Sequence, residues 1–263
     1  MRIATWNVNS VTARLPRLVD WLEQAAPDVA CLQETKVSND AFPADSVMAL
    51  GYEVASHGTG RWNGVAVLSR VGLTDVVRGL PGDPGFPDQS TPEARTLAAT
   101  CGPVRVRSVY VPNGRAPEDP HYAYKLRWLA ALASAVTGDA AGGPPFALMG
   151  DFNVAPADDD VWDPAAFVGS THVTPDERAA LAALRDTGLT DVVPSIAKGP
   201  HPYTYWDYRA GAFAKNMGMR IDLVYANAAL AAAVTDAWVD REARKGHGPS
   251  DHAPVIVDLD MKP

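Results

Sequence analysis

The sequence predicts one α/β domain whose β-sheets are covered on both faces, and three observations support this fold class. Short apolar runs typical of strands alternate with segments whose apolar residues recur at helical spacing. Most of the strand-like runs are apolar at nearly every position, which indicates strands that are buried on both faces. The 263 residues, 47% of them hydrophobic, can bury a large core, and no linker-like boundary divides the chain. We therefore expect residues 1–263 to form a single domain.

Eight apolar runs are expected to be strands, at residues 2–6, 28–32, 65–69, 95–100, 104–110, 146–149, 220–225 and 255–259. Helical spacing occurs in three segments, at residues 15–22, 120–136 and 174–187. The last segment is the best marked, because Thr174 and Glu177 can form a capping box and Gly188 provides a stop. The turn-rich stretch 79–92 has no periodicity and is expected to be a surface loop. These elements alone do not choose between two packed sheets and one doubly wound sheet.

The overall charge limits how this protein can meet its partners. A formal net charge of -8 argues against a protein that holds nucleic acid through a broad basic coat, so any contact with DNA must be local. The first residues lack the features of a signal peptide, and no apolar run approaches the roughly 18 residues of a membrane span. We expect a cytoplasmic protein that does not bind membranes. Cys31 and Cys101 lie in apolar runs, which favours reduced core thiols over a disulfide or a zinc site.

Polar residues gather at the ends of four apolar runs, where a buried amide or carboxylate needs a partner or a metal. They are Asn7, Asn9, Glu34, Asp151, Asn153, Asp251 and His252. Carboxylate and amide oxygens with one histidine and no cysteine cluster suit Mg²⁺, or Mn²⁺ in its place, better than zinc. Each residue alone could be a turn former or a surface carboxylate, but four such groups at strand ends favour a metal site. Phosphoryl chemistry is the natural use of such a site.

Eight short motifs follow one another in the order found in the exonuclease III family. They are Trp-Asn-Val-Asn-Ser at 6–10, Gln-Glu-Thr-Lys at 33–36, Asn-Gly-Val-Ala at 63–66, Tyr-Val-Pro-Asn-Gly at 110–114, Gly-Asp-Phe-Asn at 150–153, Tyr-Trp-Asp-Tyr-Arg at 205–209, Met-Arg-Ile-Asp-Leu at 219–223 and Ser-Asp-His-Ala-Pro at 250–254. The chain resembles this family over essentially its whole length. The motifs at 33–36, 110–114 and 205–209 narrow the resemblance to the DNA-repair branch of the endonuclease/exonuclease/phosphatase superfamily. The resemblance implies a four-layer α/β sandwich, with two packed mixed sheets flanked by helices and a metal site where the loops of both sheets meet.

The resemblance also implies which residues carry the chemistry. Glu34 would hold Mg²⁺, with Asn7 as a ligand or beside the ligands. The remaining residues expected around the metal are Asp151, Asn153, Asp251 and His252. In-line attack of water on phosphorus at such a site needs no covalent enzyme intermediate.

The catalytic roles would be divided among five residues. Asp151 would orient or deprotonate the attacking water, and Tyr110 would contact the phosphate or assist proton transfer. Asn153 and His252 would donate hydrogen bonds to the scissile phosphate, and Asp222 would fix the tautomer of His252. The sequence leaves open whether Asp151 or His252 is the general base.

The expected substrate is duplex DNA, degraded from its 3′ ends and cut 5′ to abasic sites by a monomer with no obligate protein partner. The residues expected to bind DNA are Arg95, Arg115, Lys125, Tyr205, Trp206, Lys215 and Met219. Tyr205 stands where relatives often carry Phe or Trp, and Met219 stands where some abasic endonucleases have Trp. Because Met219 is flexible and seals the pocket less rigidly than an indole, the pocket should discriminate against intact nucleotides less strictly.

Two alternatives stay open at this stage. One is a superfamily phosphodiesterase or phosphatase that acts on RNA, a nucleotide or a lipid headgroup, without a preference for duplexes. The other is a catalytically silent nucleic-acid-binding relative. The second is disfavoured because such a protein would normally have lost a metal carboxylate or the catalytic histidine, and here all of them are present.

Overall fold

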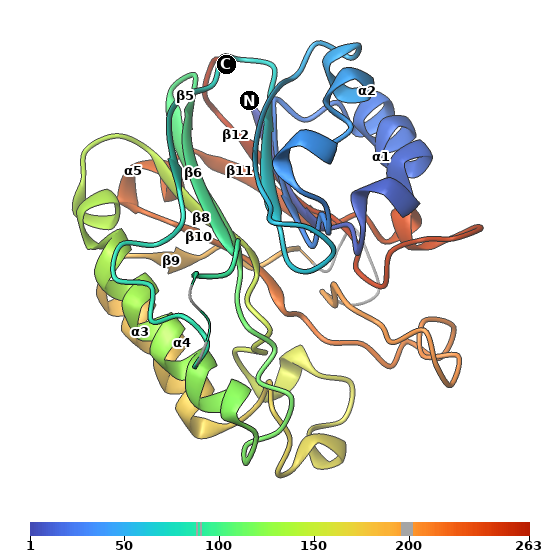
Figure 1. The fold of residues 1–263 in the computed structure, drawn as a ribbon, viewed down its shortest axis with the longest axis vertical. Helices are drawn as coiled ribbons and strands as arrows, with labels where there is room; N and C mark the ends of the chain where they lie inside the picture. Colours follow the sequence, from blue (N-terminus) through green and yellow to red (C-terminus); the bar gives the residue numbers. More distant parts are fainter. Residues whose placement is uncertain (88, 90, 196–201) are drawn as a thin grey trace.

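Two six-stranded β-sheets form the centre of the computed structural model, which describes residues 1–87, 89, 91–195 and 202–263 (Figure 1). The first sheet has the order β11 (Val234–Val239), β12 (Val255–Leu259), β1 (Arg2–Asn7), β2 (Val29–Gln33), β4 (Val65–Ser69) and β3 (Glu53–His57). The second has the order β5 (Thr74–Arg78), β6 (Thr96–Cys101), β7 (Val104–Tyr110), β8 (Phe146–Asp151), β10 (Asp222–Ala226) and β9 (Thr190–Asp191). Each sheet contains one parallel pair, β1 with β2 and β7 with β8, among antiparallel neighbours.

Helices cover the outer face of each sheet and complete four layers (Figure 1). Helices α1 (Val11–Ala25) and α2 (Ala44–Met48) pack on the first sheet, and α3 (Pro120–Ala141) and α4 (Pro175–Asp186) pack on the second. A short helix α5 (Ala228–Ala231) follows β10. The prediction of a four-layer α/β sandwich is therefore confirmed, and the doubly wound sheet is excluded. Whether residues 1–263 form one domain stays a prediction.

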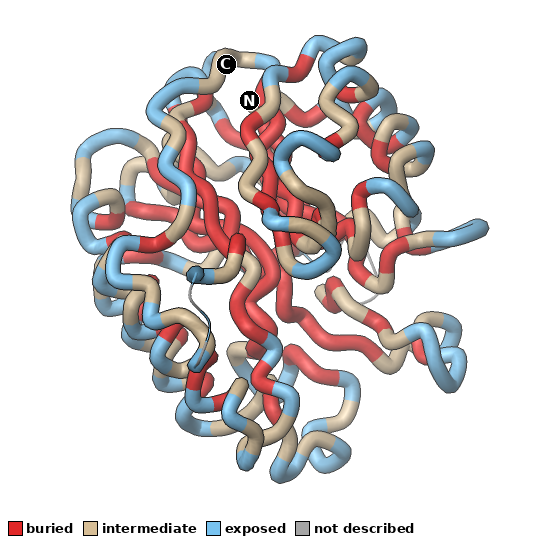
Figure 2. The backbone as a smooth tube through the Cα atoms, in the orientation of Figure 1, coloured by how far each residue is buried: buried red, intermediate tan, exposed pale blue. Residues whose placement is uncertain are grey.

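Three apolar clusters hold the layers together, one between the sheets and one under each helical layer. Figure 2 shows that buried residues run along the central strands, while exposed residues lie on the outer helices and loops. Both cysteines are free and buried in the cluster between the sheets, as predicted. In the part of the chain that the structure describes, no helix has the length and apolar character needed to cross a membrane.

All eight expected strands occur, and none of their ends shifts by more than two residues. The capping box of α4 is present, because the Thr174 hydroxyl accepts from the Glu177 amide and the Glu177 carboxylate accepts from the Thr174 amide. Residues 79–92 form a loop without helix or strand in their described part, as predicted. The sequence did not predict β3, β5, β9 and β11, and these four strands are the outer strands of the two sheets.

Strand register places polar side chains at one edge of both sheets. Asn7 is paired with Gln33 at the ends of β1 and β2, so Glu34 follows directly beside Asn7. In the second sheet, Asp151 pairs with Tyr110 on one side and with Asp222 on the other. The two strands of a parallel pair end on the same side of their sheet. The C-terminal ends of β1 and β2 and those of β7 and β8 therefore bring their last side chains together. This edge is where the candidate site forms.

Gly150 allows β8 to reach the site at the correct spacing. It has φ 150°, and a β-carbon built at this position would lie 2.0 Å from the carbonyl oxygen of Val109 on β7. No side chain fits at that distance, so only glycine lets β7 and β8 stay paired up to Asp151.

We predict that Gly150→Ala lowers the free energy of unfolding by about 3 kcal/mol, because the backbone of β8 must move away from β7. Urea denaturation followed by circular dichroism measures this. The matched control is Gly138→Ala, since Gly138 is exposed in α3 and a β-carbon there meets nothing within 4 Å. The control should be neutral or stabilising by up to about 1 kcal/mol. An equal loss in both variants would contradict the steric explanation.

Candidate active site

One side-chain amide joins carboxylates from the two sheets. Asn7 Nδ2 lies 2.8 Å from Glu34 Oε1 and 2.9 Å from Asp151 Oδ2, and it donates a hydrogen bond to each. Asn7 and Asp151 are almost completely buried. The carboxylates of Glu34 and Asp151 are thereby held facing each other at the bottom of a pocket of about 160 Å³. Asp251 and His252 line the same pocket.

The donor atoms of this pocket fit a hard divalent cation. Glu34, Asp151 and His252 can each place one potential ligand atom within 4.8 Å of the others. The Asp251 carboxylate faces the same space and accepts a hydrogen bond from Asn9 Nδ2 at 3.0 Å. Carboxylate oxygens, with no cysteine nearby, are the ligands that Mg²⁺ and Mn²⁺ prefer. Glu34, Asp151 and His252 therefore form the closest group of potential ligands, and Asp251 faces the same space. Asn7 acts as the donor that orients two of these carboxylates.

The pKa shifts of the two carboxylates reflect the negative charge that is concentrated in the pocket. Burial and the neighbouring Asp222 and Glu34 carboxylates raise the pKa of Asp151, although His252 opposes this shift. Burial also disfavours the charged form of Glu34, but the Lys36 ammonium at 2.8 Å outweighs it and lowers the pKa of Glu34. One bound cation would relieve the repulsion around Asp151.

His252 is held by a carboxylate on each side. Its Nδ1 lies 2.7 Å from Asp222 Oδ2, and its Nε2 lies 3.8 Å from Asp151 Oδ2. Burial alone would lower the pKa of His252, but the Asp222 and Asp151 carboxylates outweigh it and raise that pKa. The expected pairing of Asp222 with His252 is present. This raised pKa favours the protonated imidazole, and its Nε2 side faces Asp151 in the pocket.

Amides and a phenol complete the wall of the pocket. Asn153 has φ 51°, and its Nδ2 donates to the Val111 carbonyl at 2.9 Å while its Oδ1 accepts from Asn113 Nδ2 at 3.1 Å. Tyr110 faces Glu34 and Asp151, and burial together with the Glu34 carboxylate raises the pKa of Tyr110. The phenol therefore keeps its proton and can donate it in a hydrogen bond.

Two pocket residues were not predicted from the sequence, Asn113 and His172. Asn113 lies in the Tyr-Val-Pro-Asn-Gly motif, so a signal was available for it. His172 lies in a stretch without any motif. It has φ 80°, and its ring Nδ1 lies 2.5 Å from the Asn153 carbonyl oxygen. Only the fold brings it to the pocket.

The predicted DNA-binding role is wrong for Lys125 and Trp206, because neither side chain has exposed surface. Lys125 forms a buried ion pair with Glu177, and its ammonium also donates to the Asn153 carbonyl at 2.7 Å. Trp206 packs edge-on against Phe213 with ring centroids 5.2 Å apart. Lys125 therefore supports the catalytic loops from behind, and Trp206 belongs to the interior.

The other five expected DNA-binding residues differ in their surroundings. Arg115 and Lys215 are exposed, and Tyr205 and Met219 line the catalytic pocket. Arg95 is largely buried, pairs with Glu93 at 2.6 Å and packs over the Tyr110 ring at 4.8 Å.

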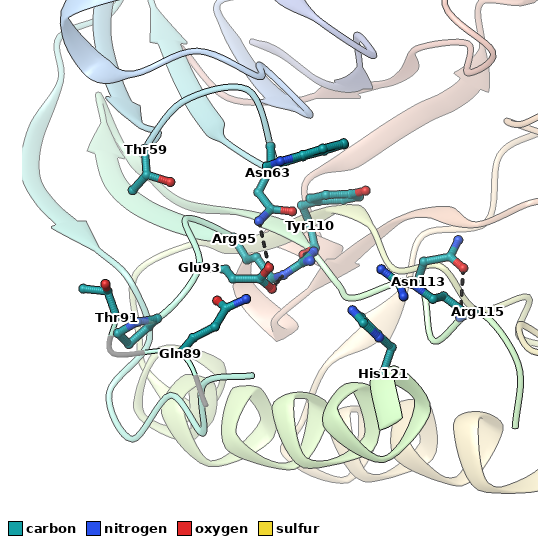
Figure 3. A pocket seen from close by; sticks show the side chains of 12 residues that line it. Thr59, Asn63, Gln89, Thr91, Glu93, Arg95, Tyr110, Asn113, Arg115 and His121 are labelled. Atoms are coloured by element: carbon teal, nitrogen blue, oxygen red, sulfur yellow. Dashed lines mark hydrogen bonds and ion pairs between the residues drawn. The ribbon is translucent and has the colours of Figure 1, made fainter. Parts of the chain in front are cut away.

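A wider depression of about 500 Å³ adjoins the catalytic pocket (Figure 3). It shares Tyr110 and Asn113 with that pocket. Arg95, Arg115 and Glu93 lie around it, so its surface is polar and carries charges of both signs.

Comparisons with known proteins agree with this arrangement. The model of the endonuclease/exonuclease/phosphatase family matches residues 4–252. The chain belongs to this family. It is 30% identical to exodeoxyribonuclease III of Haemophilus influenzae over 270 residues, covering 98% of this chain and all of the relative.

Solved structures of family members superpose closely on the chain. The 3′-5′ exonuclease NExo of Neisseria meningitidis is 40% identical, with a TM-score of 0.93 over 99% of this chain and 100% of the other. A second structure of NExo, described as a 3′ phosphatase bound to product DNA hairpin, has a TM-score of 0.92, 40% identity and the same coverage. An AP endonuclease from Archaeoglobus fulgidus is 34% identical, with a TM-score of 0.90 over 99% and 100% of the two chains. These relatives confirm the prediction of an exonuclease III-type DNA repair nuclease.

We predict that Lys125→Met lowers the free energy of unfolding by about 3–5 kcal/mol, because the Glu177 carboxylate is left buried without its cation. The matched control is Arg178→Met, which removes the neighbouring ion pair with Asp158, a pair that lies at the surface. That change should cost less than about 1 kcal/mol. Chemical denaturation of both variants measures the difference in the free energy of unfolding. Similar losses would show that burial of the Lys125–Glu177 pair does not increase the cost of breaking it.

Proposed function

We propose that this family member is a Mg²⁺-dependent nuclease that removes nucleotides from 3′ ends of duplex DNA and cuts 5′ to abasic sites. The observation that carries the proposal is the convergence of Glu34 and Asp151 on one amide, with the charged His252 opposite. Acidic oxygens for a cation and a cationic donor for a phosphate then face the same small space. The relatives named as exonuclease and AP endonuclease support the choice of DNA.

The chemistry divides among the residues of the pocket. Glu34, Asp151 and Asp251 border the space where Mg²⁺ would be held, and the ion would supply Lewis-acid chemistry to the phosphate and the attacking water. Asp151 accepts the proton of the attacking water, because its buried carboxylate borders the same small space as Glu34, Asp251 and His252. His252, kept protonated by Asp222, donates to a nonbridging oxygen of the scissile phosphate, where negative charge increases in the transition state. This assignment makes Asp151 the general base and His252 the electrostatic donor.

Neutral donors hold the phosphate in position for attack. The side-chain amides of Asn113 and Asn153 lie on the pocket wall, and the Tyr110 phenol retains its proton. Donors fixed in this way stabilise developing charge without having to reorganise during the reaction.

The polar depression of Figure 3 is suited to the sugar-phosphate backbone that leads into the pocket. Arg115 is exposed there, and Lys215 is exposed on a separate loop. Because the chain carries a net charge of -8, binding should be weak at high salt. The relative described as a 3′ phosphatase also supports 3′ phosphates as substrates. A monomeric state, the absence of an obligate protein partner and a cytoplasmic location stay predictions.

The proposal is tested with three end-labelled duplexes, which carry an internal abasic analogue, a recessed 3′ end or a 3′ phosphate. Each is incubated with Mg²⁺ or with excess EDTA, and the products are separated on a denaturing gel. Products only with Mg²⁺, on the abasic duplex and the recessed end, support the proposal. Full activity in EDTA, or hydrolysis of single-stranded RNA alone, would overturn it.

We predict that Glu34→Gln raises the Mg²⁺ concentration needed for half-maximal activity by about tenfold or more, because one charged ligand oxygen is lost at constant volume. Activity titrations with Mg²⁺ measure the change, and thermal unfolding checks that the fold is kept. The control is Glu23→Gln, which removes an exposed carboxylate on α1. An unchanged titration for Glu34→Gln would exclude Glu34 as a metal ligand.

We also predict that Asp151→Asn and His252→Asn each lower turnover by about 10²–10⁴-fold, because both groups act on the transition state. DNA affinity, measured by fluorescence anisotropy in the absence of Mg²⁺, should change little. Normal turnover at saturating DNA combined with weaker binding would contradict both roles.

A further inference from the structure

A second cavity of about 460 Å³ lies directly beside the catalytic pocket. We call it the side pocket. Its lining residues are Trp162, Phe167, His172, Tyr205, Asp207, Arg209, Ala210, Ala212, Met217 and Met219. Three of them, His172, Tyr205 and Met219, also line the catalytic pocket, so the two spaces meet at a common wall. The shared residues place the side pocket immediately next to the space where Glu34, Asp151 and His252 meet.

The lining of the side pocket is mostly apolar and contains several aromatic rings. Trp162 is 38% exposed, and its backbone amide donates to the Gly218 carbonyl at 3.0 Å, which fixes it beside the Met219 segment. Asp207 and Arg209 form an ion pair at 2.7 Å, so the charges of the lining compensate each other. Such a surface accepts a flat, uncharged ring better than a phosphate.

The catalytic pocket itself is too small to hold a whole nucleotide. Its volume of about 160 Å³ is below the roughly 300–1,000 Å³ of small-molecule sites, whereas the side pocket falls within that range. A nucleotide whose phosphate lies against Asp151 and His252 must place its base elsewhere. The depression of Figure 3 carries the charged side chains Arg95, Arg115 and Glu93 beside the exposed Trp62, and these charges suit the sugar-phosphate backbone.

We propose that the side pocket binds the nucleobase of the 3′-terminal nucleotide while its 5′ phosphate is cleaved. This inference rests on the proposed function and adds a base-binding subsite to it. Aromatic stacking holds every base, because each has a π face, and does not require a particular sequence. Met217 and Met219 are flexible and can adapt to purines and pyrimidines. The side pocket thus lets the enzyme remove any normal nucleotide, and not only a sugar that has lost its base.

The test compares two duplexes that differ only in the terminal base. One has a recessed 3′ end with a normal nucleotide, and the other ends in a tetrahydrofuran abasic analogue linked through the same phosphodiester bond. For Trp162→Ala we expect kcat/KM on the normal end to fall by about tenfold or more, as for the loss of one base stack. On the abasic end the rate should stay within about twofold of wild type.

Two further variants serve as controls. Trp162→Phe keeps an aromatic ring and should restore most of the activity on the normal end. Val168→Ala changes a residue that is 83% exposed on the same loop but outside the side pocket, and it should alter neither rate. Equal losses on both ends for Trp162→Ala, or no loss on either, would overturn the base-binding role. A wild-type enzyme that cleaves neither duplex would instead overturn the proposed function.

A binding measurement gives a readout that does not depend on turnover. A duplex with 2-aminopurine at its 3′ end is added to Asp151→Asn protein in EDTA, and the fluorescence of the base is recorded. Stacking in the side pocket predicts quenching that is lost in the Asp151→Asn/Trp162→Ala double variant. Quenching of equal size in both proteins would show that the base does not stack on Trp162.

Discussion

The contact on which the site depends is the pair of hydrogen bonds donated by the Asn7 amide. One carboxylate follows a strand of the first sheet and the other ends a strand of the second, so a single side chain fixes the distance between the layers. Gln33 makes a similar link, because its Nε2 donates to the Ser108 hydroxyl of β7 at 3.0 Å. Apolar packing brings the sheets together without specifying register, whereas these buried polar contacts are satisfied in only one alignment. The same hydrogen bonds therefore fix the alignment of the two sheets and the positions of the carboxylates in the site.

Charge is distributed so that an acidic protein can bind a polyanion. The carboxylates that carry much of the negative charge at the site are concentrated where a cation neutralises them, and Lys36 and His252 already compensate part of it. The positive side chains nearest to the site are few, and Arg95 is tied to Glu93. Affinity then comes from a small number of local contacts and the metal, and this suits an enzyme that must release its DNA product.

The sequence predicted the inner strands of both sheets and missed the outer ones, for a physical reason. An inner strand is buried on both faces and reads as a continuous apolar run, as in Val65–Ser69. Outer strands such as Thr74–Arg78 have mostly exposed side chains, so their residues are polar and carry no strong pattern. The choice between two packed sheets and one doubly wound sheet required the family resemblance. Local periodicity does not record which strands become neighbours.

The sequence predicted those site residues whose chemistry is unusual at the end of an apolar strand. It misassigned residues whose role depends on whether the fold buries them. Asn7, Glu34, Asp151 and His252 lie at strand ends, and their chemistry indicated the cluster before the fold was known. Lys125 looked like a surface cation, but its charge is matched by Glu177, which lies 52 residues away in the sequence. A pairing over that distance leaves no local signal. Trp206 was misjudged for the same reason, because exposure is a property of the fold and not of the motif.

The buried Lys125 ammonium anchors both ends of the segment that runs from Asn153 to Thr171. It holds the Asn153 carbonyl on one side and the Thr171 hydroxyl on the other, so both ends of the intervening loop are anchored to the same point. The residues between these anchors include Trp162, Phe167 and Val168, which face the substrate side or solvent. Replacements at the exposed positions of this segment leave the contacts of the Lys125 ammonium untouched. The buried pair thus fixes the two ends of the segment independently of its exposed residues.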